Sequence, residues 1–211
     1  MLIIGLVGRL RGGKNESARI LERHGFAQVI ISEILRDELE QYGLPHTTRD
    51  DFIEGGIILK ETYGTAYLMH RALQQAKTTG AKTVVIDGLR HLDEIDFLLS
   101  HQHLTCDPVS LLGVDADVNI RRERARQGDS RDTGTERFTP DFDQLDAEEN
   151  HHPNPAGPQL DQCFAILRDG AGTVIENNGP LPALETQITQ YVQRLMSDAE
   201  GRKTRTAEGR Y

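Results

Sequence analysis

Short apolar segments alternate with longer amphipathic segments along the chain. The short segments are rich in β-branched residues and mostly lack polar alternation, which is typical of strands that helices cover on both faces. They predict strands at Leu2–Val7, Val29–Ile31, Thr83–Ile86, Val109–Val114 and Thr173–Ile175. The longer segments predict helices at Asn15–His24, Glu33–Tyr42, Asp50–Tyr63, Ala66–Lys77, Leu92–Ser100, Val118–Gln127 and Leu184–Met196. This order predicts a three-layer α/β fold with a parallel sheet of about five strands and right-handed crossovers.

Two segments depart from this alternation. Residues 127–158 contain few apolar side chains and many Asp, Glu, Asn, His and Pro residues, which predicts a mobile lid or a long loop. Residues 197–211 show no apolar period, which predicts a disordered tail. We therefore expect one domain over residues 1–196, followed by the tail.

Composition narrows the class of partner. The 211-residue chain carries a formal net charge of −9, which argues against extensive contact with nucleic acid or anionic membranes. Its two cysteines, Cys106 and Cys163, are too few for a disulfide framework, and no apolar run is long enough to span a bilayer. We expect a cytoplasmic protein that binds small molecules, with no membrane partner and with nucleic acid disfavoured.

A glycine-rich turn follows the first predicted strand and precedes the first predicted helix. Its pattern, Gly8-x-x-x-x-Gly13-Lys14, is that of a phosphate cradle, in which backbone N–H groups surround phosphate oxygens and the lysine reaches the β- and γ-phosphates. The alternative is an ordinary glycine turn between a strand and a helix. The residues predicted to bind the nucleotide are Gly8, Arg9, Leu10, Arg11, Gly12, Gly13, Lys14, Asn15 and Glu16.

Asn15 stands where a Ser or Thr normally binds magnesium. An amide oxygen is also a ligand for a hard cation, although it is bulkier than a hydroxyl. Glu16 offers a carboxylate nearby, or is simply a favourable acid in a first helical turn. We predict that ATP or GTP binds, with an altered dependence on Mg²⁺.

The cradle, ISEILRDEL, VVIDGLR and the late ENNG occur in an order that resembles the P-loop nucleotide kinases. That group includes adenylate kinase, dephospho-coenzyme A kinase and the deoxynucleoside monophosphate kinases. The resemblance covers roughly residues 1–196. It implies a P-loop kinase fold, ATP as the phosphate donor, Mg²⁺ as the cofactor, acceptor-binding helices over about 33–77 and a lid over about 121–158.

The resemblance also implies an acceptor site. Arg36 in SEILR and Arg90 in DGLR match arginines that bind the acceptor phosphate, and Ser32 and Glu33 match residues of the same pocket. A planar guanidinium suits bidentate phosphate binding. The alternative is that both arginines are solvated side chains on helix surfaces.

Asp87 ends a predicted strand beside the cradle, which is where parallel sheets place ligands. A carboxylate there binds magnesium or accepts the proton of the acceptor. The alternative is a helix cap or turn residue, and the two roles are compatible. Arg49 and Lys60 are further, weaker candidates for the acceptor side.

A basic segment, NIRRERARQGDSRD, coincides with the start of the expected lid. Lid arginines of nucleotide kinases neutralise charge on the transferred phosphoryl group. Arg122 and Arg126 share a helix face and are the preferred ligands. The alternative is a solvated basic face paired with Glu123 and Asp129. The full set is Arg121, Arg122, Arg124, Arg126 and Arg131.

The loop ENNGP, residues 176–180, follows the last predicted strand. In the kinases that the chain resembles, a similar loop packs against the adenine, which implies a nucleotide contact for Asn177 or Asn178, with Asn178 preferred. The alternative is a simple Asn-Gly turn.

Three functions remain open. The first is transfer of the ATP γ-phosphate to a small phosphate-bearing acceptor, with a (deoxy)nucleoside monophosphate preferred. The second keeps this chemistry but uses dephospho-coenzyme A or a modified DNA base as the acceptor. The third is a nucleotide sensor without transfer, which the substitution at Asn15 suggests. In the kinase hypothesis, Lys14, Asp87, Arg122 and Arg126 are catalytic, and Asn15 and Asp87 bind the metal.

Overall fold

The computed structural model describes residues 1–128 and 142–208, with side chains to residue 199. Its strands are β1 (Leu2–Gly8), β2 (Ala27–Ile30), β3 (Thr83–Leu89), β4 (Val109–Asp115) and β5 (Thr173–Glu176). They form one parallel sheet in the order β2-β3-β1-β4-β5. The carboxyl ends of β1 and β3 lie side by side at the centre of the sheet, which places the turn after β1 next to the end of β3.

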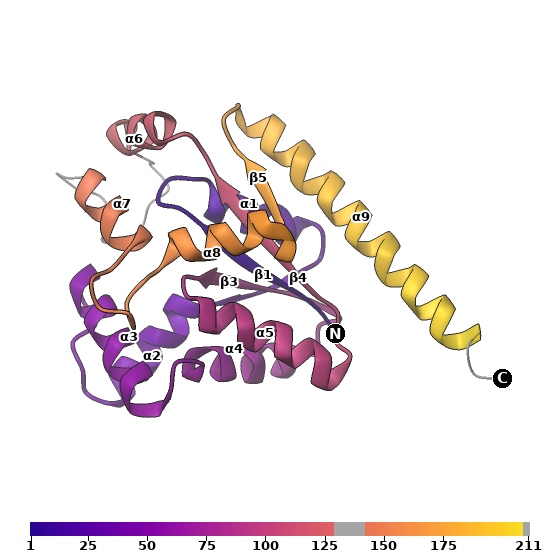
Figure 1. Ribbon diagram of the computed structural model, residues 1–211, viewed down its shortest axis with the longest axis horizontal. Helices are drawn as coiled ribbons and strands as arrows, with labels where there is room; N and C mark the ends of the chain where they lie inside the picture. The colour runs from indigo at the N-terminus through magenta and orange to yellow at the C-terminus, as the bar shows by residue number, and fades with distance from the viewer. Residues whose placement is uncertain (129–141, 209–211) are drawn as a thin grey trace.

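Helices cover both faces of this sheet (Figure 1). They are α1 (Lys14–Arg23), α2 (Ile31–Gln41), α3 (Arg49–Tyr63), α4 (Tyr67–Thr78), α5 (Leu92–Thr105), α6 (Val118–Gln127), α7 (Phe142–Asn150), α8 (Leu160–Ile166), a π-helical turn η2 (Leu167–Ala171) and α9 (Leu181–Glu208). Among the residues described, no helix combines the length and apolarity needed to cross a lipid bilayer.

The central position of β1 in the sheet explains why its sequence is almost entirely apolar. Ile3 and Val7 pack into one core with residues of α2, α4, α5 and α8, whereas Ile4 and Leu6 pack into a second core with α1 and α9. Because successive side chains of a strand point to opposite faces, both faces of β1 must be apolar when helices cover each of them. The predicted three-layer α/β fold is confirmed, with the predicted strands each found within a few residues.

The segment after α6 contains a helix that the sequence does not predict. Where the sequence predicts a lid or long loop over residues 127–158, the structure contains α7, and α8 follows it; residues 129–141, which include Arg131, lie outside the described residues. Helix α7 buries Phe142 together with the charged Asp146 and Glu149. A search for apolar periodicity does not find such a helix, because two of its buried positions carry carboxylates.

The carboxyl-terminal segment also differs from its prediction. Helix α9 continues through Ser197 to Glu208, whereas the sequence predicts a disordered tail from residue 197. The added residues include Ala, Glu, Arg and Lys, which have good helix propensity. Extending an existing helix avoids the cost of nucleation, so this segment needs no apolar face of its own.

Candidate active site

A cavity of about 1390 Å³ lies at the carboxyl ends of the central strands. Its walls include the turn after β1, the start of α2, one face of α3 and part of α7. Open α/β sheets place their ligands at this edge. The cavity is large enough to accommodate a nucleotide and a second small molecule together.

The turn between β1 and α1 is held in a compact form. The amide of Gly12 donates to the carbonyl of Arg9 (2.9 Å), and Gly13 begins α1 with φ of 106°, a value that favours glycine. Asn177, in the loop after β5, donates from Nδ2 to the Gly12 carbonyl (2.9 Å). A Cβ atom at Gly13 would lie 2.3 Å from that Nδ2 atom, so glycine is required on steric grounds as well.

The first turn of α1 receives no side-chain hydrogen bond from its N-cap residue, Gly13. Because Gly13, Lys14 and Asn15 line the cavity, the N–H groups at the start of α1 are potential donors to a phosphate, and the helix dipole favours an anion there. Leu10, Arg11, Asn15 and Glu16, which the cradle motif predicts to bind the nucleotide, also line the cavity.

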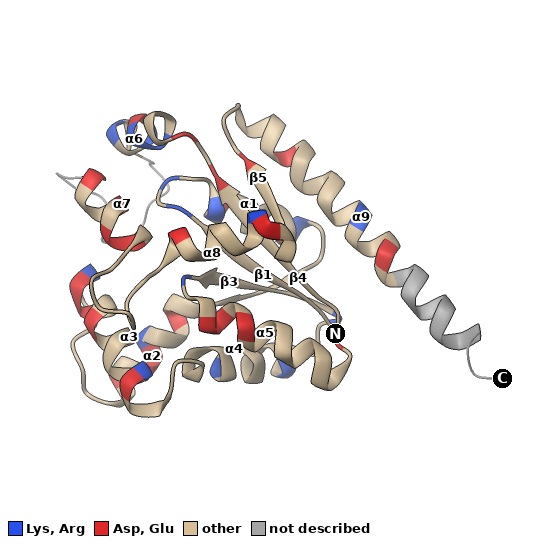
Figure 2. Cartoon of the chain, in the orientation of Figure 1, with Lys and Arg blue, Asp and Glu red and all other residues tan. Residues whose placement is uncertain are grey.

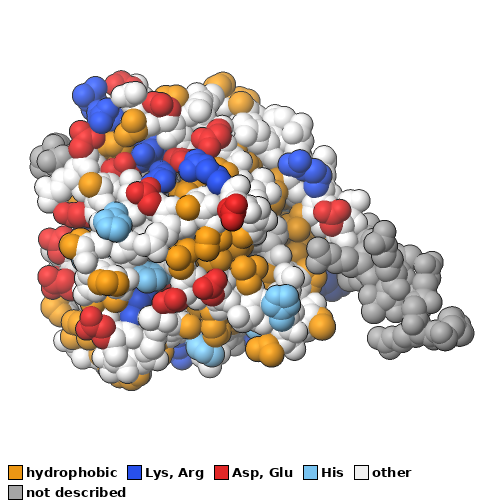
Figure 3. Space-filling view, viewed as in Figure 1, with side chains coloured by type: hydrophobic (Ala, Val, Ile, Leu, Met, Phe, Trp, Pro, Cys, Tyr) orange, Lys and Arg blue, Asp and Glu red, His pale blue; other side chains and the backbone are white. Residues whose placement is uncertain are grey.

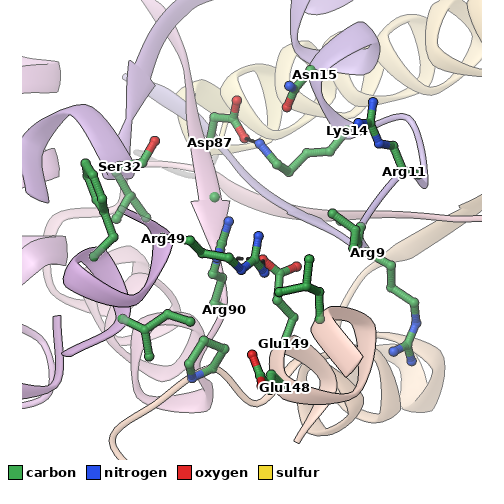
Figure 4. Close-up of a pocket in the computed structure, with 18 of the residues that line it drawn as sticks. Arg9, Arg11, Lys14, Asn15, Ser32, Arg49, Asp87, Arg90, Glu148 and Glu149 are labelled. Carbon is green, nitrogen blue, oxygen red and sulfur yellow. Dashed lines mark hydrogen bonds and ion pairs between the residues drawn. The ribbon is translucent and has the colours of Figure 1, made fainter. Parts of the chain in front are cut away.

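Lys14 and Asp87 form an ion pair at the centre of the cavity (Figure 4). The sheet register places Asp87 beside Leu6 of β1 and Ile30 of β2, so its carboxylate lies at the start of the phosphate turn. Asp87 is buried, and its second oxygen accepts from Nε2 of Gln28 (2.8 Å). This arrangement places a buried carboxylate beside a partly exposed ammonium, which can exchange Asp87 for a bound phosphate.

Mg²⁺ fits the oxygen donors in this part of the cavity. Among the described residues no group of three or more His, Cys, Asp or Glu side chains could hold a metal ion alone. However, Mg²⁺ commonly binds through one or two protein oxygens together with substrate phosphates and water. Asp87 and Asn15 line the cavity and could supply such oxygens, whereas Glu16 already contacts Arg19 (3.3 Å).

Two arginines meet on the opposite side of the cavity. Arg49 and Arg90 both contact the carboxylate of Glu149, Arg90 at 2.9 Å (Figure 4). Arg49 is the first residue of α3, and the capping box between Thr48 and Asp51 fixes the start of that helix. Guanidinium groups held in this way form a strong binding site for an anion such as a phosphate.

Glu149 is almost fully buried, with 3% of its surface exposed. Burial alone would raise the pKa of this carboxyl group. The charges of Arg90 and Arg49, the hydrogen bond from Arg49 and the charge of Lys14 outweigh burial, and they hold the pKa below its ordinary value. Glu149 is therefore ionised at neutral pH and occupies the site where the two arginines would hold a phosphate.

The other residues predicted on the acceptor side do not join the contact of Arg49 and Arg90 with Glu149. Arg36 lines the cavity, but its guanidinium lies over the ring of Phe52, 5.4 Å from the ring centroid. Ser32 lines the cavity, whereas Glu33 is exposed and does not. Arg49, the weaker candidate from the sequence, is the residue that joins Arg90.

The arginines of α6 separate into different environments. Arg124 lines the cavity and donates to the carbonyls of Arg11 (3.3 Å) and Asn177 (2.8 Å), and desolvation lowers its pKa. Arg122 contacts Asp143 (2.7 Å), and Arg126 is 72% exposed beside Glu123. The structure thus brings Arg124 to the cavity, and not Arg122 or Arg126, which were preferred from the sequence.

Arg121 joins the basic helix α6 to the acidic helix α7 (Figure 2). Its guanidinium forms two hydrogen bonds to Asp146, and it donates to the carbonyls of Ala116 (3.0 Å) and Leu10 (3.3 Å). Through these contacts, the position of α7, and with it Glu149, is tied to the phosphate turn.

The side chain of Arg9 points away from Lys14 and Asp87 (Figure 4). It contacts Asp115 (3.1 Å), Asp161 (2.8 Å) and Asn150, and it lies 4.7 Å from the centroid of the Phe164 ring. Basic and acidic side chains are interspersed on this face of the molecule (Figure 3). Arg9 therefore contributes its backbone to the turn, while its charge is neutralised within the protein.

The two asparagines of the loop after β5, either of which the resemblance implies as a nucleotide contact, lie in different environments. Asn177 lines the cavity and supports the turn through Gly12, as described above. Asn178, the residue preferred from the sequence, accepts from the amide of Asp117 (2.7 Å) and does not line the cavity. Gly179 and Pro180 complete the wall.

Comparison of sequences shows that the chain is similar to proteins named UPF0200. No family model matches it. A UPF0200 protein of Methanoculleus marisnigri is 27% identical over 134 residues, 62% of this chain and 70% of that protein. One from Methanosarcina mazei is 30% identical over 97 residues, 46% of this chain and 51% of that protein. The chain thus matches between about half and 70% of the length of these relatives.

A solved structure supports the fold. TT1252 from Thermus thermophilus superposes with a TM-score of 0.52 at 17% identity, over 92% of this chain and 97% of that one. Shikimate kinase from Aquifex aeolicus gives 0.48 at 14% identity, over 91% and 96%. The likeness to TT1252 supports the α/β fold described above, and at this identity it extends no further than the fold.

Proposed function

We propose that this protein is a kinase that transfers the γ-phosphate of ATP to a small acceptor bearing a phosphate, with a nucleoside monophosphate as the preferred acceptor. The observation that carries the proposal is that one cavity contains two separate groups of residues suited to binding an anion. The phosphate turn with Lys14 and its partner Asp87 lies on one side, and Arg49 and Arg90 lie on the other.

Each residue has a defined task in this reaction. The turn and Lys14 bind the β- and γ-phosphates of ATP, and Arg49 and Arg90 bind the acceptor's phosphate. An acceptor oxygen forms a bond to the γ-phosphorus while the bond from that phosphorus to the β–γ bridging oxygen breaks, and ADP leaves. Asp87 accepts the proton of the attacking group or binds Mg²⁺, which neutralises charge on the phosphates.

Two features support a preference for a phosphate-bearing acceptor. The arginine pair already holds one anion, the carboxylate of Glu149. An acceptor phosphate would carry more charge and more acceptor oxygens than this carboxylate, so it can displace Glu149 from the two guanidinium groups. Positioning and electrostatics of this kind supply most of the catalysis in phosphoryl transfer.

The test is an assay of ADP formation with ATP, Mg²⁺ and a panel of nucleoside monophosphates, alongside dephospho-coenzyme A. Turnover that depends on one acceptor and disappears in Lys14→Met supports the proposal. A matched control is Lys77→Met, an exposed lysine of α4 outside the cavity. Turnover that is absent with every acceptor, or that survives Lys14→Met, would contradict it.

A nucleotide sensor is the second candidate, and Asn15 favours it because it replaces the usual magnesium-binding hydroxyl. In that case, ATP binding would displace Asp87 from Lys14, and no phosphoryl transfer would follow. Tight ATP binding with no acceptor-dependent ADP formation would select the sensor over the kinase.

A further inference from the structure

A buried ion pair forms part of the cavity wall away from the phosphate turn. Lys60 of α3 is 7% exposed and Glu94 of α5 is 2% exposed, and Nζ and Oε1 lie 3.2 Å apart. Both side chains line the cavity. Buried ion pairs add little net stability compared with apolar residues of similar size, so stability alone does not account for this pair.

The two partners differ in how much hydrogen-bonding capacity they retain. Glu94 Oε2 accepts from the amides of Arg90 (2.8 Å) and His91 (3.2 Å) at the start of α5, and Oε1 contacts Lys60. Three of the roughly four acceptor positions of this carboxylate are therefore in use. An ammonium group carries three N–H donors, and Glu94 is the partner of Lys60 among the residues that the structure describes. The pair thus presents mainly donors to a ligand.

The wall between the arginine pair and Lys60 is apolar. Arg49 and Lys60 lie on the same face of α3, separated by about three turns, or ~16 Å of helix axis. Phe52, Ile53 and Ile57 line the cavity between them. A ligand with a phosphate at one end, a flat ring in the middle and hydrogen-bond acceptors at the far end matches this order of groups.

Gly56 leaves space in the middle of this wall. Glycine inside a helix is destabilising by about 1 kcal/mol relative to alanine, so its presence calls for a reason. For Gly55 the reason is packing, because a Cβ atom there would lie 2.4 Å from Leu39. A Cβ atom at Gly56 would meet only Leu35, at an ordinary 3.7 Å. The neighbouring residues therefore do not require glycine at this position, and the missing side chain enlarges the cavity.

We propose that Lys60, held in place by Glu94, donates hydrogen bonds to an oxo group on the acceptor's base. The protein would then prefer monophosphates of 6-oxopurines or 4-oxopyrimidines to their amino counterparts. A carbonyl oxygen accepts from an ammonium, as do the adjacent O6 and N7 atoms of guanine, whereas an amino group would point its own donors at Lys60. This inference rests on the proposed function and specifies its substrate class.

The test compares monophosphates that differ in this group and in the protonation of the ring nitrogen next to it. Inosine monophosphate is compared with AMP, and UMP with CMP, by kcat/KM at saturating ATP. For the ring size that is turned over faster, the oxo member should exceed the amino member by about tenfold or more, the worth of one hydrogen bond to a charged group. Equal values, or a preference for the amino member, would overturn the inference while leaving the proposed kinase intact.

Two variants locate the effect. Lys60→Met should reduce the oxo/amino ratio to below about threefold without changing the KM for ATP, whereas Lys77→Met should leave the ratio unchanged. Gly56→Val touches neither charged residue and should raise the KM for the acceptor about tenfold or more, with the KM for ATP unchanged. An unchanged ratio in Lys60→Met, or an unchanged acceptor KM in Gly56→Val, would overturn the placement. No transfer to any of the four monophosphates would overturn the proposed function and this inference together.

Discussion

Replacing Glu149 by glutamine removes the charge that holds the two acceptor-side arginines together. The side chain keeps its size and an oxygen that accepts a hydrogen bond, so the change isolates the electrostatic contribution. Glu149 is buried and contacts Arg49 and Arg90, and Arg121 ties its helix to the phosphate turn through Asp146. The free energy of unfolding should therefore fall at neutral pH.

The magnitude follows from burial and from what remains after the change. Removing one partner of a buried ion pair commonly costs about 3–5 kcal/mol. Arg90 is 39% exposed and can recover contact with water, which reduces the expected loss to about 2 kcal/mol. For a chain of this length, that loss lowers the melting temperature by roughly 4–8 °C.

The pH dependence distinguishes an electrostatic loss from a packing loss. The pKa of Glu149 in the folded state lies below its ordinary value of 4.5. Its ionised form therefore stabilises the protein fully above that ordinary value, and the contribution disappears as the pH falls through the lowered folded-state pKa. The difference between the wild-type protein and Glu149→Gln should be largest at pH 7 and should close in strong acid.

Urea unfolding at a series of pH values measures this difference, with Glu148→Gln as the matched control. Glu148 is the neighbouring residue on α7, and among the described residues its carboxylate accepts from Gln144 (2.9 Å) and contacts no arginine. We expect the control to change the free energy of unfolding by less than about 0.5 kcal/mol. A loss below that value for Glu149→Gln at pH 7, or a loss of constant size from pH 7 into strong acid, would refute the reasoning.

Three further predictions concern the nucleotide side of the cavity. Asp87→Asn should reduce kcat about 10²-fold or more while ATP still binds, because the partner of Lys14 and candidate proton acceptor is lost; unaltered kcat would exclude that role. Asn15→Thr should lower the Mg²⁺ concentration needed for half-maximal ATP binding severalfold, as a calorimetric titration would show; an unchanged requirement would remove Asn15 from the metal site. Arg124→Ala should raise the KM for ATP about tenfold in steady-state kinetics, because Arg124 lines the cavity. Replacing the exposed Arg126 by alanine should leave this KM unchanged, and the reverse result would show that Arg126 and not Arg124 binds ATP.

The fold was predictable because its signals are local. The strands appear as apolar segments since both faces of the sheet are covered, and the cradle appears as a short motif between a strand and a helix. Helix α7 was missed because its buried positions include Asp146 and Glu149. Their burial depends on arginines from other elements, and a charged residue read alone indicates a solvated surface.

The candidate site was predictable in part for the same reason. The glycine-rich motif predicts Lys14, and the end of a strand predicts Asp87. The structure brings these two side chains together in an ion pair. The pairing of Arg49 with Arg90 depends on Glu149, which lies far away in the sequence, so no local pattern indicates it. For α6, neighbouring arginines differ only in the helix face that they occupy, and the orientation of that helix is set by the contacts of Arg121.

The most direct test of the account is whether the turn between β1 and α1 binds a nucleoside triphosphate through its phosphates. Isothermal titration of the wild-type protein with ATP and with GTP, each with and without Mg²⁺, is compared with the same titrations of Lys14→Met. We predict one binding site per chain for ATP or GTP, and an affinity at least about tenfold weaker in Lys14→Met, since a charged contact to the phosphates is lost. Absence of binding to the wild-type protein under all four conditions, or equal affinity in the variant, would contradict the account.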